Sequence, residues 1–256
     1  MFHHNKKTTH EPIINLSGKN MVKKNDLKGI IKFFGEIILD AVIIITLVLF
    51  IRSYIVAPFQ VHGTSMCNTL NYQNGICNTG YGEYLIISKF GYIIGQPKRG
   101  DIIVFRPPGT TQFNKLESLF RTLFHLDGQE FFIKRVIGLP GDTIELKNGN
   151  VYLTNSTHPN GTKLDEPYLS AENQGKTYPL IPGKTTFHVP EGEYLVFGDN
   201  RLVSTDARSC FRSTFIEGCR TENDHFISPE SMEGRAWLIL FPFNKIGTVK
   251  RTEYKE

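Results

Sequence analysis

Little in this sequence points to a ligand held by charge, metal or nucleotide chemistry. The formal net charge is only +4 over 256 residues, which provides no global field for nucleic acid. There are only four cysteines, and none of their separations matches the C-x2–4-C spacing of structural zinc sites. The sequence also lacks a glycine-rich phosphate-binding loop and repeats of propeller or solenoid length. It therefore predicts no cofactor, no metal and no nucleic-acid partner.

One long hydrophobic run dominates the first quarter of the chain. Residues 33–51 read FFGEIILDAVIIITLVLFI, and a helix of this length spans roughly 28 Å, close to the hydrocarbon thickness of a bilayer. Glu36 and Asp40 interrupt the run near its basic end, where a carboxylate can reach the interface or meet Lys32. Lysines gather ahead of it, at Lys6, Lys7, Lys19, Lys23, Lys24, Lys28 and Lys32.

These features predict a membrane anchor rather than a cleaved signal peptide or a buried core helix. A cleaved signal peptide needs a shorter apolar region followed by a small-x-small site, but here Arg52-Ser53-Tyr54-Ile55 follows. A core helix does not explain the basic tail. By the positive-inside rule, residues 1–32 are expected in the cytoplasm, residues 33–51 in the bilayer and residues 52–256 outside.

The exported part reads as short strands separated by turns. Asn148-Gly149 predicts a hairpin turn, because both residues tolerate positive φ. The pattern predicts a mainly β fold, an antiparallel β-body with a smaller inserted β-region around 143–193. The expected strands are Phe59–Val61, Tyr84–Lys89, Asp101–Phe105, Phe131–Ile137, Thr143–Lys147, Val151–Leu153, Thr186–Val189, Tyr194–Gly198 and Ala236–Leu240.

Residues 114–126 break the β pattern. Leu116, Leu119, Phe120 and Leu123 recur at helical spacing and predict one apolar face. We expect this helix to pack on the β-body. The alternative is that its apolar face lies in the membrane interface.

Ser65 and Lys134 are a candidate nucleophile and base. Gly63 precedes the serine and allows an unusual backbone at a strand end. Lys134 lies within an apolar strand-like run, and lysine is rarely fully buried without a partner. Each residue alone is weak evidence, since a surface serine and a solvent-facing lysine are the ordinary interpretation.

Further motifs complete a pattern around these two residues. Residues 98–105 read KRGDIIVF, and residues 198–208 read GDNRLVSTDAR. Together with S-M-x-x-T-L at 65–70 and K-R-V-I-G-L-P-G-D at 134–142, this ordered set closely resembles the bacterial type I signal peptidases. The resemblance covers nearly all of residues 33–245.

The resemblance implies a membrane-bound serine endopeptidase that cuts signal peptides from exported preproteins after small-x-small sites. Ser65 matches the family nucleophile, Lys134 its general base, and Ser204 the residue that hydrogen-bonds and orients the lysine. The family also has two supporting charged pairs. They correspond to Asp199 with Arg135 and to Asp206 with Arg208 in this chain. The family fold is an antiparallel β-body that docks its active site against the membrane. We expect a monomer whose partners are preproteins and the lipid bilayer.

The chain departs from the family pattern at three positions. Gly63 stands where some members have a serine whose hydroxyl binds the oxyanion, and losing such a donor costs about 3–4 kcal/mol where nothing replaces it. Other members also have glycine here, so backbone N–H groups, including that of Ser65, are expected to serve. Asn68 replaces a proline that stiffens the loop. Ala207 replaces a serine and removes one hydrogen bond.

A lysine can act as the base only when its amine is neutral. Its ordinary pKa is about 10.4, so lowering it to near neutrality costs roughly 4–5 kcal/mol. Burial among apolar side chains disfavours the ammonium. The neighbours Phe131, Phe132, Ile133, Val136 and Ile137 are expected to form that apolar shell.

The cysteines all follow the anchor, where export permits disulfides. The natural pairing is Cys67 with Cys77 and Cys210 with Cys219. The other two pairings and free buried thiols stay open, because sequence alone does not fix connectivity.

Three other functions fit these residues less well than a peptidase. A Ser65–His62 arrangement lacks the acidic partner of a triad. A catalytically inactive, anchored peptide-binding β-domain would not need the complete dyad. A LexA-like self-cleaving DNA-binding regulator would need a helix-turn-helix and no membrane span.

Overall fold

The computed structural model describes residues 24–67, 69–110, 131–212 and 219–254. The chain divides into two units, Met1–Leu47 and Val48–Glu256, each of which is described by itself. Three sequence predictions fall outside the described residues: the cytoplasmic tail up to residue 23, the departure at Asn68 and the helix over 114–126.

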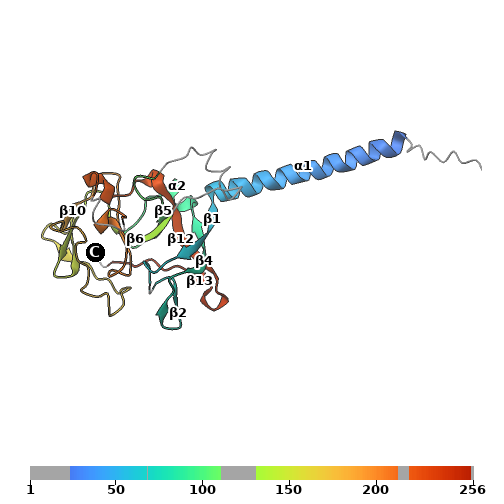
Figure 1. The fold of residues 1–256 in the computed structure, drawn as a ribbon. Coiled ribbons are helices and arrows are strands. Elements are labelled where there is room, and N and C mark those ends of the chain that lie inside the picture. The colour runs from blue at the N-terminus through green and yellow to red at the C-terminus, as the bar shows by residue number, and fades with distance from the viewer. Residues whose placement is uncertain (1–23, 68, 111–130, 213–218, 255–256) are drawn as a thin grey trace, which may run out of the picture. The chain divides into compact units, whose positions relative to one another are not determined.

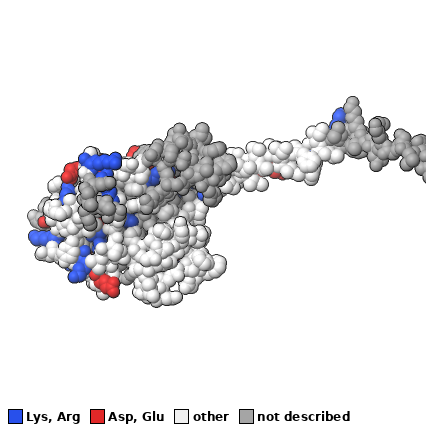
Figure 2. All heavy atoms as spheres, viewed as in Figure 1, with Lys and Arg blue, Asp and Glu red and all other residues white. Residues whose placement is uncertain are grey.

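Helix α1 (Lys24–Tyr54) contains the predicted anchor and is longer than the predicted run at both ends. An 18-residue stretch within Lys28–Tyr54 has a mean hydropathy of 2.6, and among the described residues this is the one helix long and apolar enough to cross a membrane. Its apolar side chains are exposed, and its visible surface is almost free of charge (Figure 2). Lys32 and Glu36 pair at 3.8 Å, which is one of the two arrangements expected for this carboxylate.

The β-body is built on one antiparallel sheet, with strand order β1-β4-β12-β5-β6-β11 and β13 paired to β12 (Figure 1). Its strands are β1 (Val56–His62), β4 (Tyr81–Ser88), β5 (Ile102–Phe105), β6 (Phe132–Gly138), β11 (Leu195–Phe197), β12 (Met232–Phe241) and β13 (Gly247–Thr248).

Two smaller sheets complete the β structure. One has the order β10-β7-β8-β9, and the other is the hairpin β2-β3. Their strands are β2 (Tyr72–Gln73), β3 (Ile76–Cys77), β7 (Thr143–Lys147), β8 (Asn150–Thr154), β9 (Thr162–Lys163) and β10 (Thr186–His188). The predicted Asn148-Gly149 turn joins β7 to β8, with φ of 51° at Asn148 and 74° at Gly149.

The predicted mainly antiparallel β fold is confirmed, and each predicted strand overlaps an observed one. Sequence reasoning missed β2, β3, β9 and β13, which have two residues each and so cannot show alternation. It also missed the short helix α2 (Phe90–Ile94) and the 3-10 turns Ala207–Ser209, Glu222–His225, Pro229–Ser231 and Phe243–Lys245.

The central strands are buried on both faces, which explains why they read as continuous apolar runs. In β5, Ile103 and Phe105 belong to one core cluster, while Ile102 and Val104 belong to another. Alternation along β6, which pairs with β5, places Lys134 and Arg135 on opposite faces of the sheet. The sheet therefore separates the candidate base from the charged pair predicted beside it.

Both natural disulfide pairings are confirmed. Cys67 is bonded to Cys77, and Cys210 to Cys219. The first closes a short ring directly after Ser65, which ties the β2–β3 hairpin to the segment that carries the candidate nucleophile.

Candidate active site

The structure brings Ser65 and Lys134 together. Lys134 lies on β6 opposite Ile103 of β5 and is only 4% exposed. Its Nζ donates to Ser65 Oγ at 2.8 Å and to the Ile133 carbonyl at 3.0 Å, and it lies 5.1 Å from the centre of the Phe132 ring. The amine is thus held within hydrogen-bond reach of the hydroxyl in largely apolar surroundings.

Ser65 is half-buried and borders a groove on the β-body. Side chains from several segments line this groove, among them the strands β1, β4 and β6. The lining side chains include Phe59, His62, Tyr81, Phe131, Phe132 and Thr205. The groove is therefore open to a chain that lies across the hydroxyl, and it has aromatic walls.

Gly63 shapes the turn that follows β1. Its φ is +79°, and a side chain at this position would meet no atom within 4 Å. Glycine is therefore required by the backbone conformation and not by crowding. Among the described residues the Ser65 amide N–H has no hydrogen-bond acceptor, so it is available to a ligand.

The loop after β11 is hydrogen-bonded to this turn. The Asn200 amide N–H donates to the Ser65 carbonyl at 3.0 Å, and Asn200 Nδ2 donates to the Thr64 carbonyl at 3.2 Å. A Cβ on Gly198 would lie 2.1 Å from Ser204 Oγ and 2.5 Å from the Ser65 carbonyl oxygen. The glycine is thus what lets the two loops approach.

Ser204 differs from its predicted role. Its side chain is buried, but within the described part of the chain its Oγ has no hydrogen-bond partner, so the expected bond to Lys134 is not formed. The Oγ instead lies against Gly198, and the Ile133 carbonyl accepts from the lysine.

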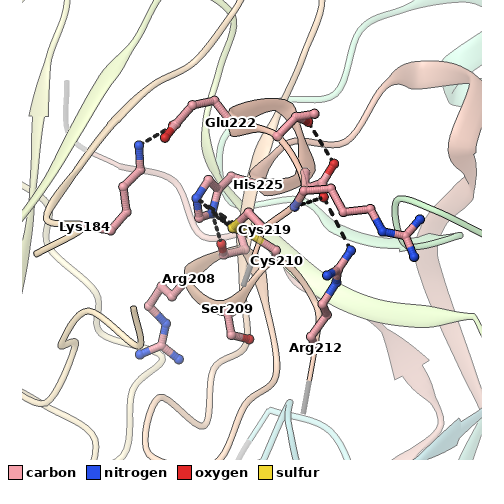
Figure 3. The surroundings of a disulfide bond; sticks show 12 residues. Lys184, Arg208, Ser209, Cys210, Arg212, Cys219, Glu222 and His225 are labelled. Carbon is pink, nitrogen blue, oxygen red and sulfur yellow. Dashed lines mark hydrogen bonds and ion pairs between the residues drawn. A yellow bond between two sulfur atoms is a disulfide. The ribbon is translucent and has the colours of Figure 1, made fainter. Parts of the chain in front are cut away.

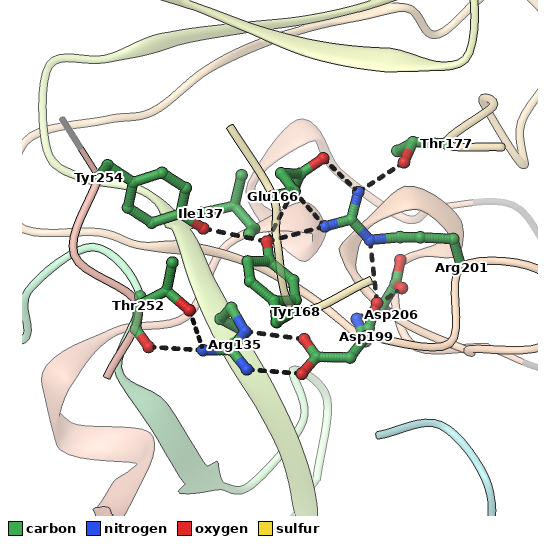
Figure 4. Close-up of polar contacts among 12 residues, drawn as sticks. Arg135, Ile137, Glu166, Tyr168, Thr177, Asp199, Arg201, Asp206, Thr252 and Tyr254 are labelled. Atoms are coloured by element: carbon green, nitrogen blue, oxygen red, sulfur yellow. Dashed lines mark hydrogen bonds and ion pairs between the residues drawn. The ribbon is translucent and has the colours of Figure 1, made fainter. Parts of the chain in front are cut away.

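The predicted Arg135–Asp199 pair is formed (Figure 4). By the alternation along β6 it lies on the face of the sheet opposite Lys134. Arg135 Nε and Nη2 donate to the two carboxylate oxygens at 2.8 and 2.6 Å, and the side chains are 1% and 0% exposed. Burial alone would lower the pKa of Arg135, but Asp199 raises it overall. Asp199 also accepts from Thr69 Oγ1, so the pair connects β6 to the segment after Ser65.

The Asp206–Arg208 pair is also formed and fully buried. Arg208 Nε and Nη2 donate to the carboxylate at 2.9 Å, and the Gly198 N–H donates at 3.0 Å. Burial alone would raise the pKa of Asp206, but the Arg208 charge and these hydrogen bonds outweigh it, so the pKa is lowered. This carboxylate therefore stays ionised and anchors the loop that carries Ser204.

Sequence reasoning missed the role of Arg201. This arginine is buried, donates to the Gly198 carbonyl at 3.0 Å and pairs with Glu166, which Tyr168 also contacts (Figure 4). Arg201 stands inside the GDNR motif and could have been suspected. Glu166 carried no signal, because only the fold brings it beside the motif.

A cluster around His225 was also not foreseen (Figure 3). The sulfurs of Cys210 and Cys219 and the ring nitrogens of His225 lie within 4.8 Å of one another. In a disulfide these sulfurs carry no thiolate charge, which a metal ligand requires. The His225 Nδ1–H donates to the Ala207 carbonyl at 2.5 Å, and burial lowers the pKa of His225. The cluster thus braces the turn that contains Arg208.

Comparison with known proteins identifies the family of this chain. The family model described as signal peptidase, peptidase S26, matches residues 34–241. The chain belongs to this family. It is similar to signal peptidase I of Bacillus licheniformis, 32% identical over 236 residues that cover 89% of this chain and 96% of that one. It is also similar to signal peptidase I T of Bacillus subtilis strain 168, 32% identical over 214 residues that cover 82% and 86% of the two chains.

Membership of the S26 family establishes the class of reaction. The chain is a hydrolase, a serine peptidase of the kind that removes signal peptides. Signal peptidase I homologues are membrane-anchored, and helix α1 fits that anchoring. A solved signal peptidase I from Enterococcus faecalis V583 is 27% identical and covers 56% of this chain and 97% of its own, with a TM-score of 0.34.

Proposed function

We propose that Ser65 and Lys134 form the catalytic dyad of this peptidase. The observation that carries the proposal is the 2.8 Å contact between Lys134 Nζ and Ser65 Oγ, made by a lysine that is only 4% exposed. Desolvation at such a site favours the neutral amine, the form that can accept the serine proton.

The reaction proceeds in two halves. Ser65 Oγ attacks the scissile carbonyl while its proton passes to Lys134 Nζ, and the resulting ammonium returns a proton to the leaving amine. An acyl ester then remains on Ser65. Lys134 next takes a proton from water as the water oxygen attacks the ester carbonyl. The Lys134 ammonium then gives this proton to the departing Ser65 Oγ, which releases the acyl product as a carboxylic acid and restores the neutral amine. We infer that Ser204, whose buried hydroxyl has no partner among the described residues, turns towards the lysine during this cycle and orients it.

The oxyanion is stabilised by backbone donors. Gly63 offers no hydroxyl, whereas the Ser65 N–H has no acceptor within the described residues and lies on the same turn as the nucleophile. Preorganised donors of this kind stabilise the transition state more than the substrate.

We further propose specificity for small residues at −1 and −3. It is supported by the rings of Phe59, Phe131 and Phe132, which contribute to the walls of the groove that Ser65 borders. A preprotein with alanine at −1 should be cut, and the same preprotein with tryptophan at −1 should stay intact. Equal cleavage of both would refute this part of the proposal.

The membrane arrangement follows from the lysines that precede the anchor. We propose that residues 1–32 are cytoplasmic, that residues 33–51 span the bilayer and that residues 52–256 act outside as a monomer on exported preproteins, without nucleic acid. Protease added to intact spheroplasts should digest the β-body and spare an N-terminal tag. Protection of the β-body would reverse the orientation, and light scattering on the detergent-solubilised protein tests the monomer.

Substitution of the dyad tests the catalytic proposal. The detergent-solubilised protein is incubated with an Ala-x-Ala preprotein, and products are read by mass spectrometry. Ser65→Ala and Lys134→Ala should each abolish cleavage while circular dichroism stays unchanged. Lys134→Arg should also be inactive, because a guanidinium remains protonated. Turnover by folded Ser65→Ala would remove Ser65 from the mechanism.

A further inference from the structure

A buried asparagine lies behind the turn that presents Ser65. Asn71 is 0% exposed, and its Nδ2 donates to the carbonyls of Gly63 at 2.8 Å, Asn78 at 2.9 Å and Gly80 at 3.0 Å. The first of these carbonyls belongs to the turn of the nucleophile. The other two belong to the segment between β3 and β4. One side chain thus joins the nucleophile turn to its neighbouring segment.

Asn71 is itself held firmly. Its backbone N–H donates to Glu83 Oε2 at 2.6 Å, and Glu83 is buried and pairs with Lys245 at 2.6 Å. Its φ of 61° is a conformation that asparagine tolerates better than most residues. It also lies within the ring closed by the Cys67–Cys77 disulfide.

The side-chain amide is locked sterically as well as by hydrogen bonds. A Cβ added to Gly82 would lie 1.7 Å from Asn71 Oδ1 and 2.5 Å from its Cγ. Gly82 is therefore glycine because the amide occupies the space of a side chain. Any residue larger than glycine there must displace Asn71.

We propose that Asn71 is a positioning residue for catalysis, which fixes the backbone of Gly63 and so the hydroxyl and N–H of Ser65. This inference rests on the proposed role of Ser65 as nucleophile. Asn200 donates to the Thr64 and Ser65 carbonyls. Gly63 is held separately, by Asn71 at its carbonyl and by the Gly80 carbonyl, which accepts from the Gly63 N–H at 3.2 Å. With a positive φ and no side chain, Gly63 depends on its hydrogen bonds for a fixed conformation.

The effect should appear in the chemical step rather than in substrate binding. Displacement of a reacting group by about 1 Å can cost on the order of a hundredfold in rate. Asn71→Gly removes the amide while it still permits positive φ. We expect kcat for preprotein cleavage to fall roughly tenfold to a hundredfold with KM nearly unchanged. Asn71→Asp, which keeps the size but replaces the donor with an acceptor, should fall at least as far.

A matched control is available directly after β8. Asn155 also organises a turn, since its Oδ1 accepts from the Thr157 and His158 N–H groups at 3.0 and 2.8 Å. Asn155→Gly should leave kcat unchanged, because that turn lies outside the groove of Ser65. Ser65→Ala is measured alongside, so that failure of the dyad proposal is distinguished from failure of this one.

A double-mutant cycle with Gly82 separates positioning from general loss of structure. Gly82→Ala should lower kcat in the wild-type background, because its methyl displaces the Asn71 amide. In the Asn71→Gly background the same change should add little, because the amide is gone. The inference is overturned if kcat survives Asn71→Gly, if the two changes are independent, or if both Asn71 variants unfold at the assay temperature.

Discussion

The buried Arg135–Asp199 pair offers a sharp test of what holds the catalytic loops in place. Asp199→Asn keeps the shape of the side chain but removes its charge. Because the two side chains are 1% and 0% exposed, the Arg135 guanidinium would be left buried without a counter-ion. Breaking such a pair costs about 3–5 kcal/mol. For a β-body of this size, that lowers the melting temperature by roughly 6–20 °C.

Thermal unfolding of the detergent-solubilised protein, followed by near-ultraviolet circular dichroism, measures this change. The exposed Lys184–Glu222 pair is the control, with side chains 23% and 74% exposed, and Glu222→Gln should cost under about 1 kcal/mol. Replacing both buried partners, as Arg135→Met with Asp199→Leu, should recover most of the loss. If Asp199→Asn melts within a degree or two of wild type, the variant does not leave the Arg135 guanidinium as a buried, unpaired charge. That result would refute the reasoning.

Two further predictions concern stability. Since the pKa of Asp206 is lowered in the fold, its ionisation stabilises the protein above its unfolded pKa of about 3.9, and this stability is lost as pH falls through the lowered value. As the pH is lowered from 7 to 2, the melting temperature should therefore fall more steeply for wild type than for Asp206→Asn. An equal fall in both proteins would contradict this. Replacing both Cys67 and Cys77 by alanine should lower the free energy of unfolding by about 3 kcal/mol, because the disulfide restricts a short loop of the unfolded chain. Urea unfolding checks it, and no change in the midpoint would contradict it.

The sequence predicted the large strands because alternation and turn chemistry are local signals. Val151, Leu153 and the Asn148-Gly149 turn identify β7 and β8 without reference to the rest of the fold. Two-residue strands such as β2 carry no period. The Cys67–Cys77 disulfide and the Asn71 side chain hold the β2–β3 hairpin, and neither contact shows as a period in the sequence.

The candidate site was predictable as a set of residues but not as a network. Ser65 and Lys134 stand in ordered motifs, and strand alternation is enough to place Arg135 on the face opposite the lysine. Nothing local connects Asn71 to Gly63 or His225 to Ala207, because only the packed loops create those hydrogen bonds. A motif match predicted the position of Ser204 in the chain but not the direction of its side chain, because the rotamer depends on the neighbouring residues in the fold.

The proposed mechanism depends on a neutral amine at position 134 that acts as the base for Ser65. Replacing Lys134 with cysteine creates the sole free thiol, because the four native cysteines are paired. Alkylation of that thiol with an aminoethyl group rebuilds a lysine-like amine, whose pKa is lower because of the adjacent sulfur. The Lys134→Cys protein should be inactive, and aminoethylation should restore cleavage with the acidic limb of its pH–rate profile shifted to lower pH. Cleavage before alkylation, or restored cleavage with an unshifted profile, would contradict the role of Lys134 as base.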